Sequence, residues 1–200
     1  KRYPKNFRVQ HIKYYRDRAD ELAIINYTSG TTGFSKGVMI PYRAIWSNLD
    51  FAYQVLSPLK MGDSTISILP MAHMYGMAFE FIFEFCRGCH IFFLTRVPSP
   101  QIIAQAFSDI KPALIIAVPL VIEKIIRKRV FPLVQTHKMK ILMNMPVISK
   151  KVKEKICEQV KNAFGGNFYE IIVGGAPLNQ EVETFLYNIG LVSTSLYIFI

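Results

Sequence analysis

Residues 27–37 read YTSGTTGFSKG, and the rest of the chain is organised around this stretch. Apolar runs at 22–25 and 38–40 flank it and indicate two short buried strands. Glycine allows positive φ and has no Cβ, so backbone amides can approach a ligand at Gly30, Gly33 and Gly37. Further donors are the hydroxyl groups of Thr28, Ser29, Thr31 and Thr32 and the ammonium of Lys36. Donors and a positive charge on one loop suit an anion and predict a site for nucleotide phosphates.

The spacing differs from that of two common nucleotide-binding loops. The P-loop pattern requires Gly-Lys followed by Ser or Thr, whereas here Ser35 precedes Lys36 and Gly37 follows it. The dinucleotide pattern G-x-G-x-x-G fails because no glycine lies between Gly30 and Gly33. The simpler alternative is a polar hairpin connection, since clusters of Gly, Ser and Thr commonly form loops.

Residues 28–37 resemble the signature loop of the adenylate-forming (AMP-binding) superfamily. This superfamily includes luciferases, nonribosomal adenylation domains and acyl-CoA synthetases such as the long-chain fatty acid–CoA ligases. Ser35 stands where the family has proline, which removes a fixed φ but leaves each phosphate-contacting position in place. The resemblance implies that Thr28 and Lys36 are catalytic. The residues that it implies bind the β- and γ-phosphates of ATP are Thr28, Ser29, Gly30, Thr31, Thr32, Gly33 and Lys36.

Two other segments resemble motifs of the same family. The turn Gly174-Gly175-Ala176-Pro177 follows an expected strand, and ligands bind outside the carboxyl ends of strands in open α/β sheets. It resembles the adenine-contacting turn, with an ordinary strand-to-helix turn as the alternative. The segment 70–76, PMAHMYG, resembles the one whose histidine borders the carboxylate substrate. The acyl-substrate residues that it implies are His73, Met74, Tyr75 and Gly76.

Apolar side chains close to His73 allow two interpretations. Met74, Met77, Phe79 and Phe83 suit a slot for an alkyl chain, because flexible methionines adapt to irregular ligands. They equally suit the core, because apolar helix faces usually pack inward.

Strands and helices are expected to alternate along most of the chain. Strands are expected at 21–27, 35–40, 64–69, 90–94, 113–118 and 169–173. Helices are expected at 41–56, 75–86, 98–110, 119–129, 149–164 and 179–188. Pro41 and Pro119 are expected to open helices, and Gly165-Gly166 to end one. The predicted fold class is α/β, with layered parallel or mixed sheets and flanking helices.

Composition limits the class of protein. The 200 residues are 51% hydrophobic and 19% charged, which is typical of a globular chain. Three cysteines are too few for a disulfide framework and favour a reducing cytoplasm. Cys86, Cys89 and His90 match the c-type haem attachment pattern, but the absence of an export signal favours incidental cysteines beside a glycine-stopped helix. A zinc site would need two more ligands near this pair, so no metal site is predicted.

The net charge is +10, with basic clusters at 1–18, 124–140 and 150–161. Solvated helix faces explain these clusters better than nucleic-acid binding, because the later two lack interleaved aromatic residues. The longest apolar stretch, 71–85, is interrupted by charge and too short to span a bilayer. We therefore expect a cytoplasmic protein that binds small molecules and makes at most peripheral membrane contact, with its oligomeric state open.

The resemblance covers about residues 21–190. It implies that 1–200 is part of the large N-terminal adenylation domain, with 191–200 a divergent tail and the C-terminal domain absent. The family's Mg²⁺-binding glutamate has no counterpart here. The implied reaction activates a fatty acid with ATP and Mg²⁺ to an acyl-adenylate and then to acyl-CoA, and we expect little turnover from this chain alone. The alternatives are another carboxylate substrate, such as an aryl or amino acid, and a non-catalytic nucleotide-binding fragment.

Overall fold

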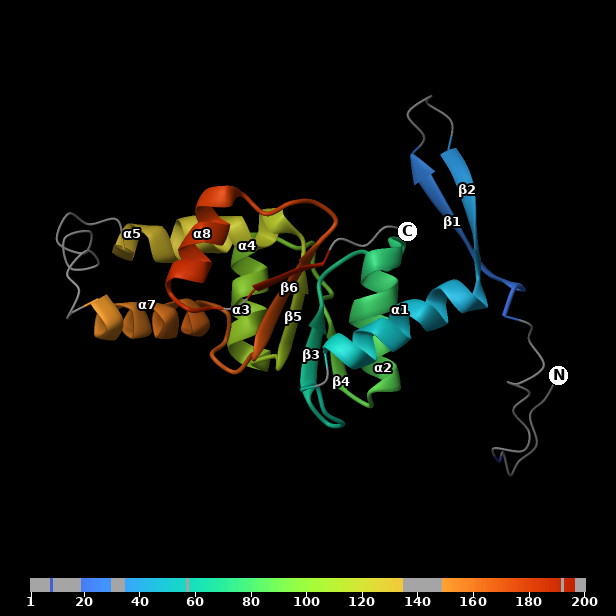
Figure 1. The fold of residues 1–200 in the computed structure, drawn as a ribbon, viewed down its shortest axis with the longest axis horizontal. Helices are drawn as coiled ribbons and strands as arrows, with labels where there is room; N and C mark the ends of the chain where they lie inside the picture. Colours follow the sequence, from blue (N-terminus) through green and yellow to red (C-terminus); the bar gives the residue numbers. More distant parts are fainter. Residues whose placement is uncertain are drawn as a thin grey trace. The chain divides into compact units, whose positions relative to one another are not determined.

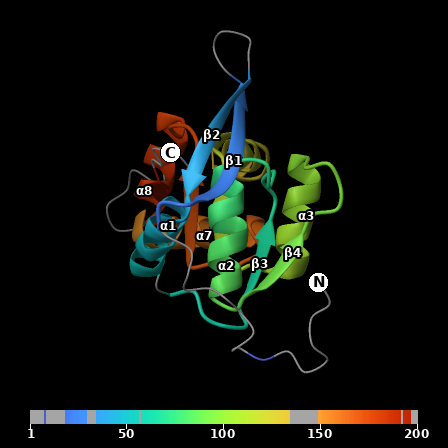
Figure 2. The ribbon, with the colours of Figure 1, turned by 90° about the vertical axis from the view of Figure 1, so that its right-hand side faces the viewer.

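The computed structural model describes residue 8 and residues 19–29, 35–56, 58–134, 149–191 and 193–196. It divides into two compact units, Lys1–Phe51 and Ala52–Ile200. Figures 1 and 2 show the elements of each unit. The expected α/β class is confirmed, because each unit combines strands with helices.

The first unit contains the antiparallel pair β1 (Leu22–Ser29) and β2 (Ser35–Pro41), followed by α1 (Tyr42–Val55). Both strands form where the apolar runs predict them. The expectation that they are buried is wrong, because the apolar residues Leu22, Ile25, Val38 and Met39 are exposed. The expectation that Pro41 opens the helix is wrong, because Pro41 is the last residue of β2 and pairs with Leu22. On the predicted apolar face of α1, burial increases from the half-buried Ile45 and Leu49 to the fully buried Ala52 and Leu56.

The second unit contains two parallel sheets, as predicted from its alternating strands and helices. One pairs β3 (Ser64–Ser67) with β4 (His90–Phe93), and the other has the order β5 (Leu114–Ala117), β6 (Glu170–Gly174), β7 (Ser193–Leu196). A backbone hydrogen bond of 2.9 Å from Ala113 N to Ser64 O joins the two sheets between β3 and β5. Residues 193–196, within the tail expected to diverge, form a strand parallel to β6.

Helices cover both sides of these strands in Figure 1, with α2 on one side and α3, α4, α7 and α8 on the other. Figure 2 shows α2 in front of β3. The helical elements are η2 (Gly76–Phe83, a π-helix), α2 (Glu84–Cys86), α3 (Pro100–Ile110), α4 (Pro119–Ile125), η3 (Ile126–Val130, a π-helix), α5 (Phe131–Val134), α7 (Ser149–Ala163) and α8 (Gln180–Asn188). In the described residues, no helix combines the length and apolarity that crossing a bilayer requires.

Two helix ends test the sequence prediction. The helix expected to end at Arg129 instead continues through η3 and α5 to Val134, because Val130, Phe131 and Val134 are buried in the core. The predicted end of α7 is confirmed: Gly165 and Gly166 adopt positive φ, and the Gly166 amide donates to Lys161 O at 2.8 Å.

Alternation along the strands divides the second unit into two faces. Ile66 and Ile68 of β3 join the large core formed with α3, α4, α7 and α8. Thr65 and Ser67, also buried, point to the opposite face, where Ser67 contacts η2. This polar face of β3 positions the segment described next.

Candidate functional site

The β1–β2 hairpin brings the two predicted catalytic residues opposite each other. Thr28 pairs with Lys36 in the strand register, and Ser29 pairs with Ser35. Directly opposed residues of an antiparallel pair have their Cβ atoms about 5 Å apart, so the side chains of Thr28 and Lys36 start from neighbouring positions at the end of the hairpin that adjoins residues 30–34. Both side chains are exposed, and Lys36 forms no ion pair with the described residues. The predicted Gly30, Thr31, Thr32 and Gly33 lie outside the described residues.

Gly37 lies within β2, as the predicted strand 35–40 has it, and it does not use the positive φ that glycine allows. A Cβ here would lie 3.2 Å from Ile25 Cγ2 and 3.4 Å from Tyr27 Cε1. The residue instead leaves room for two side chains of β1.

The segment Pro70–Gly76 connects β3 to η2 and is held by local backbone hydrogen bonds. The His73 amide donates to Pro70 O at 3.0 Å, and the Met77 amide donates to His73 O at 3.0 Å. Gly76 is buried, and a Cβ on it would lie 3.0 Å from Pro70 O. His73 is exposed while Met74 is buried, so the segment presents the histidine to solvent.

Of the side chains considered for an alkyl slot, three are buried: Met74, Phe79 and Phe83. Phe79 packs on the Tyr75 ring, and Phe83 packs edge-on against Tyr53. Their burial favours the core interpretation for these three residues. Met77, in contrast, is half-buried.

The predicted adenine turn lies at the carboxyl end of β6. Gly174 is the buried last residue of the strand, and Gly175, Ala176 and Pro177 are exposed. Gly175 adopts a φ of +83°, a conformation that glycine permits at little cost. The polypeptide therefore leaves the sheet through an exposed turn.

Tyr75 joins the predicted acyl segment to the predicted adenine turn. Its hydroxyl lies 3.4 Å from Ala117 O of β5 and 3.4 Å from Ile172 O of β6 and donates to this pair of carbonyls. A Cβ on Gly174 would lie 2.6 Å from Tyr75 Cζ. We call this arrangement of Tyr75, Gly174, Ala117 and Ile172 the Tyr75–Gly174 contact. Two segments far apart in sequence thus meet at the carboxyl ends of parallel strands.

Two buried carboxyl groups follow Tyr75 on the next helical elements, and no role was predicted for them from the sequence. Glu80 of η2 is 0% exposed and Glu84 of α2 is 1% exposed. Burial raises the pKa of Glu80 to about 7 and, together with the charge of Glu80, raises the pKa of Glu84 to about 9. Burial and the Glu80 charge also raise the pKa of the Tyr75 phenol. The sequence signal that could have indicated these two carboxyl groups is the presence of acidic residues within the apolar stretch 71–85.

Cys86, Cys89 and His90 lie where α2 ends and β4 begins. Cys86 and His90 are exposed, and Cys89 is half-buried with its thiol 3.7 Å from Lys60 O. Burial is the main cause that raises the pKa of Cys89 to about 11, which disfavours a reactive thiolate. Within the described ranges, no three His, Cys, Asp or Glu side chains form a group that could hold a metal ion.

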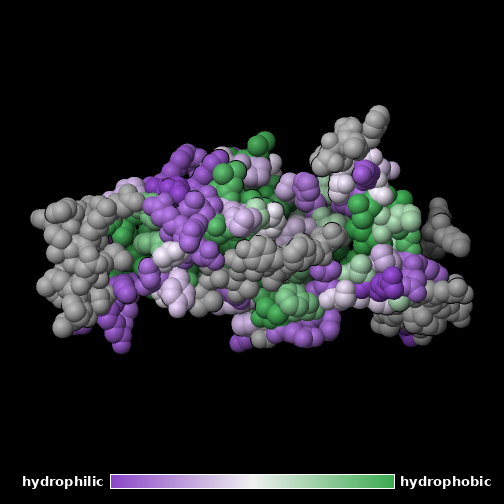
Figure 3. Space-filling view, turned by 45° about the horizontal axis from the view of Figure 1, so that its top comes forward, coloured by the Kyte–Doolittle hydropathy of each residue, from purple (hydrophilic) through white to green (hydrophobic). Residues whose placement is uncertain are grey.

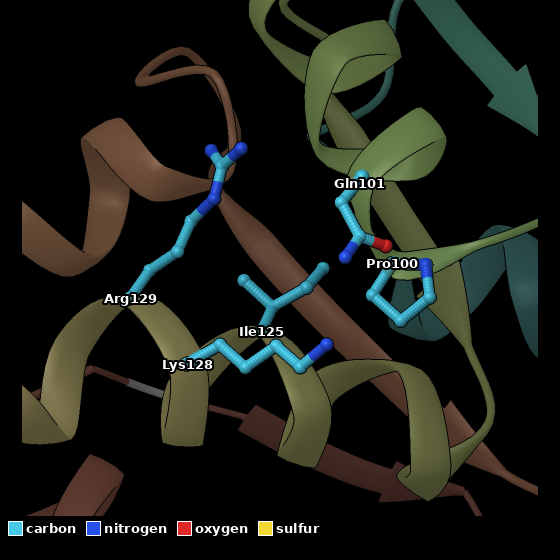
Figure 4. A pocket seen from close by; sticks show the side chains of 5 residues that line it. All are labelled: Pro100, Gln101, Ile125, Lys128 and Arg129. Carbon is cyan, nitrogen blue, oxygen red and sulfur yellow. The ribbon is translucent and has the colours of Figure 1, made fainter.

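A small hollow elsewhere in the second unit is lined by Pro100, Gln101, Ile125, Lys128 and Arg129 (Figure 4). None of the predicted site residues lines it. Figure 3 shows apolar patches between the polar side chains of one face. The exposed large apolar residues of η2, α2 and β4 are Phe81, Phe85, Phe92 and Phe93.

The fold is that of the N-terminal domain of an adenylate-forming enzyme. The inhibitor-bound N-terminal domain of FACL13 from Mycobacterium tuberculosis aligns with 91% of this chain and 37% of its own, at a TM-score of 0.61 and 18% identity. ATP-bound MatB from Rhodopseudomonas palustris aligns with 84% of this chain and 27% of its own, at a TM-score of 0.55 and 25% identity.

The sequence profile described as AMP-binding enzyme matches residues 4–197, and the chain belongs to this family. Long-chain-fatty-acid–CoA ligase 5 of Mus musculus is 29% identical over 184 residues, which cover 84% of this chain and 26% of the mouse protein. Long chain acyl-CoA synthetase 5 of Arabidopsis thaliana is 29% identical over 189 residues, which cover 84% of this chain and 28% of the Arabidopsis protein. The chain spans about a quarter of the length of these curated relatives.

Proposed function

We propose that this chain is part of the adenylating domain of an ATP-dependent acyl-CoA ligase that activates a medium- or long-chain fatty acid. The observation that carries the proposal is the register of the β1–β2 hairpin, in which Thr28 lies opposite Lys36, close in sequence to Gly30 and Gly33. The names of the curated relatives support a long-chain acid as the substrate class.

In the first step of the proposed reaction, a carboxylate oxygen attacks the α-phosphorus of ATP. A new oxygen–phosphorus bond forms, the bond to the β-phosphate oxygen breaks, and pyrophosphate leaves. Negative charge grows on the leaving group, and the Lys36 ammonium and the Thr28 hydroxyl stabilise it. Chemistry of this kind depends mainly on positioning and electrostatic stabilisation. The glycine-rich residues 30–33 contribute backbone amides to the same phosphates.

The other predicted residues receive the two ends of the acyl-adenylate. The exposed turn Gly175-Ala176-Pro177 receives the adenine ring, and the buried Gly174 sets its position. The exposed His73 faces the carboxylate end of the acid. Met74, Tyr75 and Gly76, which follow His73 in the same segment, complete the acyl subsite. Tyr75 fixes the distance between the two subsites because it contacts both.

In the second step, the thiol of CoA attacks the acyl carbon, loses its proton, and displaces AMP. The described residues offer no cluster of metal ligands, so we assign no residue of this chain to Mg²⁺. We expect the 200-residue chain alone to show little complete turnover, because the relatives it matches are about four times longer.

Calorimetric titration with a non-hydrolysable ATP analogue tests the phosphate site. Lys36→Ala should weaken binding about tenfold or more, since charge-assisted hydrogen bonds to phosphate are lost. Lys150→Ala, which removes an exposed lysine of α7, should leave the affinity within about twofold of wild type and serves as the matched control. Equal affinities for wild type and Lys36→Ala would remove the basis of the proposal.

A panel of acids tests the substrate class. Decanoate and longer fatty acids should bind the chain in the presence of the ATP analogue, and aromatic acids and amino acids should bind more weakly. A preference for an aryl or amino acid would reassign the substrate while leaving the adenylating function intact. Pyrophosphate release measured in parallel would detect any turnover by the chain itself.

A further inference from the structure

Glu80 is a buried carboxyl group of the second unit that accepts several hydrogen bonds. Its Oε2 atom accepts hydrogen bonds from Leu69 N at 2.8 Å, Ile68 N at 3.1 Å and Ser67 Oγ at 3.2 Å. A carboxylate that accepts several hydrogen bonds while fully buried is a costly arrangement, because burial disfavours its charge. Glu80 lies on a π-helix, and π-helical backbone, although rare overall, often occurs at functional sites.

The three donors lie at the end of β3, where the polypeptide leaves the sheet. Ser67 is the last residue of β3, and its carbonyl accepts from Leu94 N at 3.2 Å. The amides of Ile68 and Leu69 follow just beyond the end of β3, and both donate to the Glu80 carboxylate. The next residue, Pro70, begins the segment that carries His73.

The far end of the same segment is held by different contacts. Tyr75 reaches the carbonyls of Ala117 and Ile172, and Gly76 lies against Pro70. Pro70–Gly76 is therefore a short loop fixed at both ends, by Glu80 on the side of β3 and by Tyr75 on the side of β6. His73 lies between the two fixed points and is exposed.

We propose that Glu80 is a positioning residue for the acyl substrate: by holding the amides of Ile68 and Leu69, it sets the position of His73 relative to the turn at Gly174. This inference rests on the proposed function. Glu80 is buried inside the protein and acts through the loop, so its loss should affect the acid more than the nucleotide phosphates.

The surroundings of Glu80 also indicate how the contact responds to pH. Tyr75 and Glu84 are the titratable groups whose pKa values its charge raises, and β3 presents the hydroxyls of Thr65 and Ser67. In the described structure, Glu80 Oε1 is buried without a hydrogen-bond partner. An ionised carboxylate is a stronger acceptor than a neutral one, so the hold on the loop should tighten as the pH rises from 6 to 8.

The test compares Glu80→Met, Glu80→Gln and the matched buried control Glu84→Gln. Calorimetry measures the Kd of decanoate, in the presence of the ATP analogue, and the Kd of the analogue alone. Glu80→Met removes the acceptor and should raise the decanoate Kd about fivefold or more, with the analogue Kd within about twofold. Glu80→Gln retains one acceptor oxygen and should restore most of the affinity. Glu84→Gln, which leaves the two amide contacts in place, should bind like wild type.

The pH profile separates positioning from a purely structural role. For wild type the decanoate Kd should fall about two- to threefold from pH 6 to pH 8, and for Glu80→Gln it should stay constant because the amide does not titrate. If Glu80→Met does not fold, the comparison of the wild-type and Glu80→Gln pH profiles alone tests the inference.

Three results would overturn the inference: unchanged decanoate affinity in a folded Glu80→Met, an equal loss for decanoate and the analogue, or a Glu80→Gln profile identical to wild type. Wild-type protein that binds neither ligand would instead contradict the proposed function itself.

Discussion

The β1–β2 hairpin and the Tyr75–Gly174 contact present their predicted site residues in opposite ways. In the hairpin, Thr28 and Lys36 are close in sequence, exposed and opposed by strand register. In the contact, Tyr75 meets carbonyls 42 and 97 residues away and is influenced by the buried carboxyl group of Glu80. The first arrangement can change its side chains at little cost to folding, whereas in the second the predicted site residues also hold the fold together.

The largest expected effect that separates the two regions is the pH dependence of stability. The folded pKa values of Glu80, about 7, and Glu84, about 9, lie above the ordinary value for a carboxyl group. The folded protein therefore binds more protons than the unfolded chain. The resulting stability is complete below the ordinary pKa and is lost as the pH rises through 7 and then 9. The free energy of unfolding should fall by several kcal/mol from pH 5 to pH 8.

Urea denaturation at a series of pH values measures this slope. Glu84→Gln replaces the protonated carboxyl with an amide that cannot ionise, so its slope should be shallower than that of wild type. Glu21→Gln, an exposed position just before the hairpin, should leave the slope unchanged. Parallel curves for wild type and Glu84→Gln would contradict the assignment of a raised pKa.

Adding a methyl group at a glycine of each region should give the next largest difference. Gly174→Ala places Cβ 2.6 Å from the Tyr75 ring and should cost about 2 kcal/mol, as overpacking does. Gly37→Ala meets Ile25 at 3.2 Å, at the surface, and should cost less than about 1 kcal/mol. Chemical denaturation compares the two.

A double variant checks the cause of the Gly174→Ala cost. In a Tyr75→Ala background the ring is absent, so adding Gly174→Ala should cost far less than it does in wild type. Strictly additive costs would mean that Tyr75 is not what excludes a side chain at position 174.

Removing one hydroxyl from each region should give the smallest difference. Tyr75→Phe loses the donor shared by Ala117 O and Ile172 O and should destabilise the protein by about 1 kcal/mol. Tyr27→Phe removes the hydroxyl of an exposed tyrosine of β1 and should have no measurable effect. Thermal unfolding of both variants provides the comparison, and an equal shift in Tm would contradict it.

Sequence reasoning performed best where the determining contacts are local. Both strands of the hairpin, the face of α1 and the end of α7 follow from residues within a few positions of one another. Errors arose where distant contacts decide the outcome. Pro41 stays in β2 because Leu22 pairs with it, and the helix after β5 passes Arg129 because Val130, Phe131 and Val134 complete the core.

The same limit applies to the candidate site, which stays a prediction. Local motifs point to the turn at Gly174 and to the segment around His73, but nothing local indicates that Tyr75 would join them. Glu80 was visible as a charge inside an apolar run, yet its partners Ile68 and Leu69 are recognisable only once η2 packs on β3. Buried polar networks need both partners before either can be interpreted.

The central claim is that the end of the β1–β2 hairpin that adjoins residues 30–34 binds nucleotide phosphates through Thr28 and Lys36 together. A double-mutant cycle on the Kd of the ATP analogue, using Thr28→Ala, Lys36→Ala and the double variant, measures this directly. We predict that each single substitution weakens binding and that the combined loss differs clearly from the sum, because the two side chains share one ligand group. Affinity unchanged from wild type in all three variants would contradict the claim.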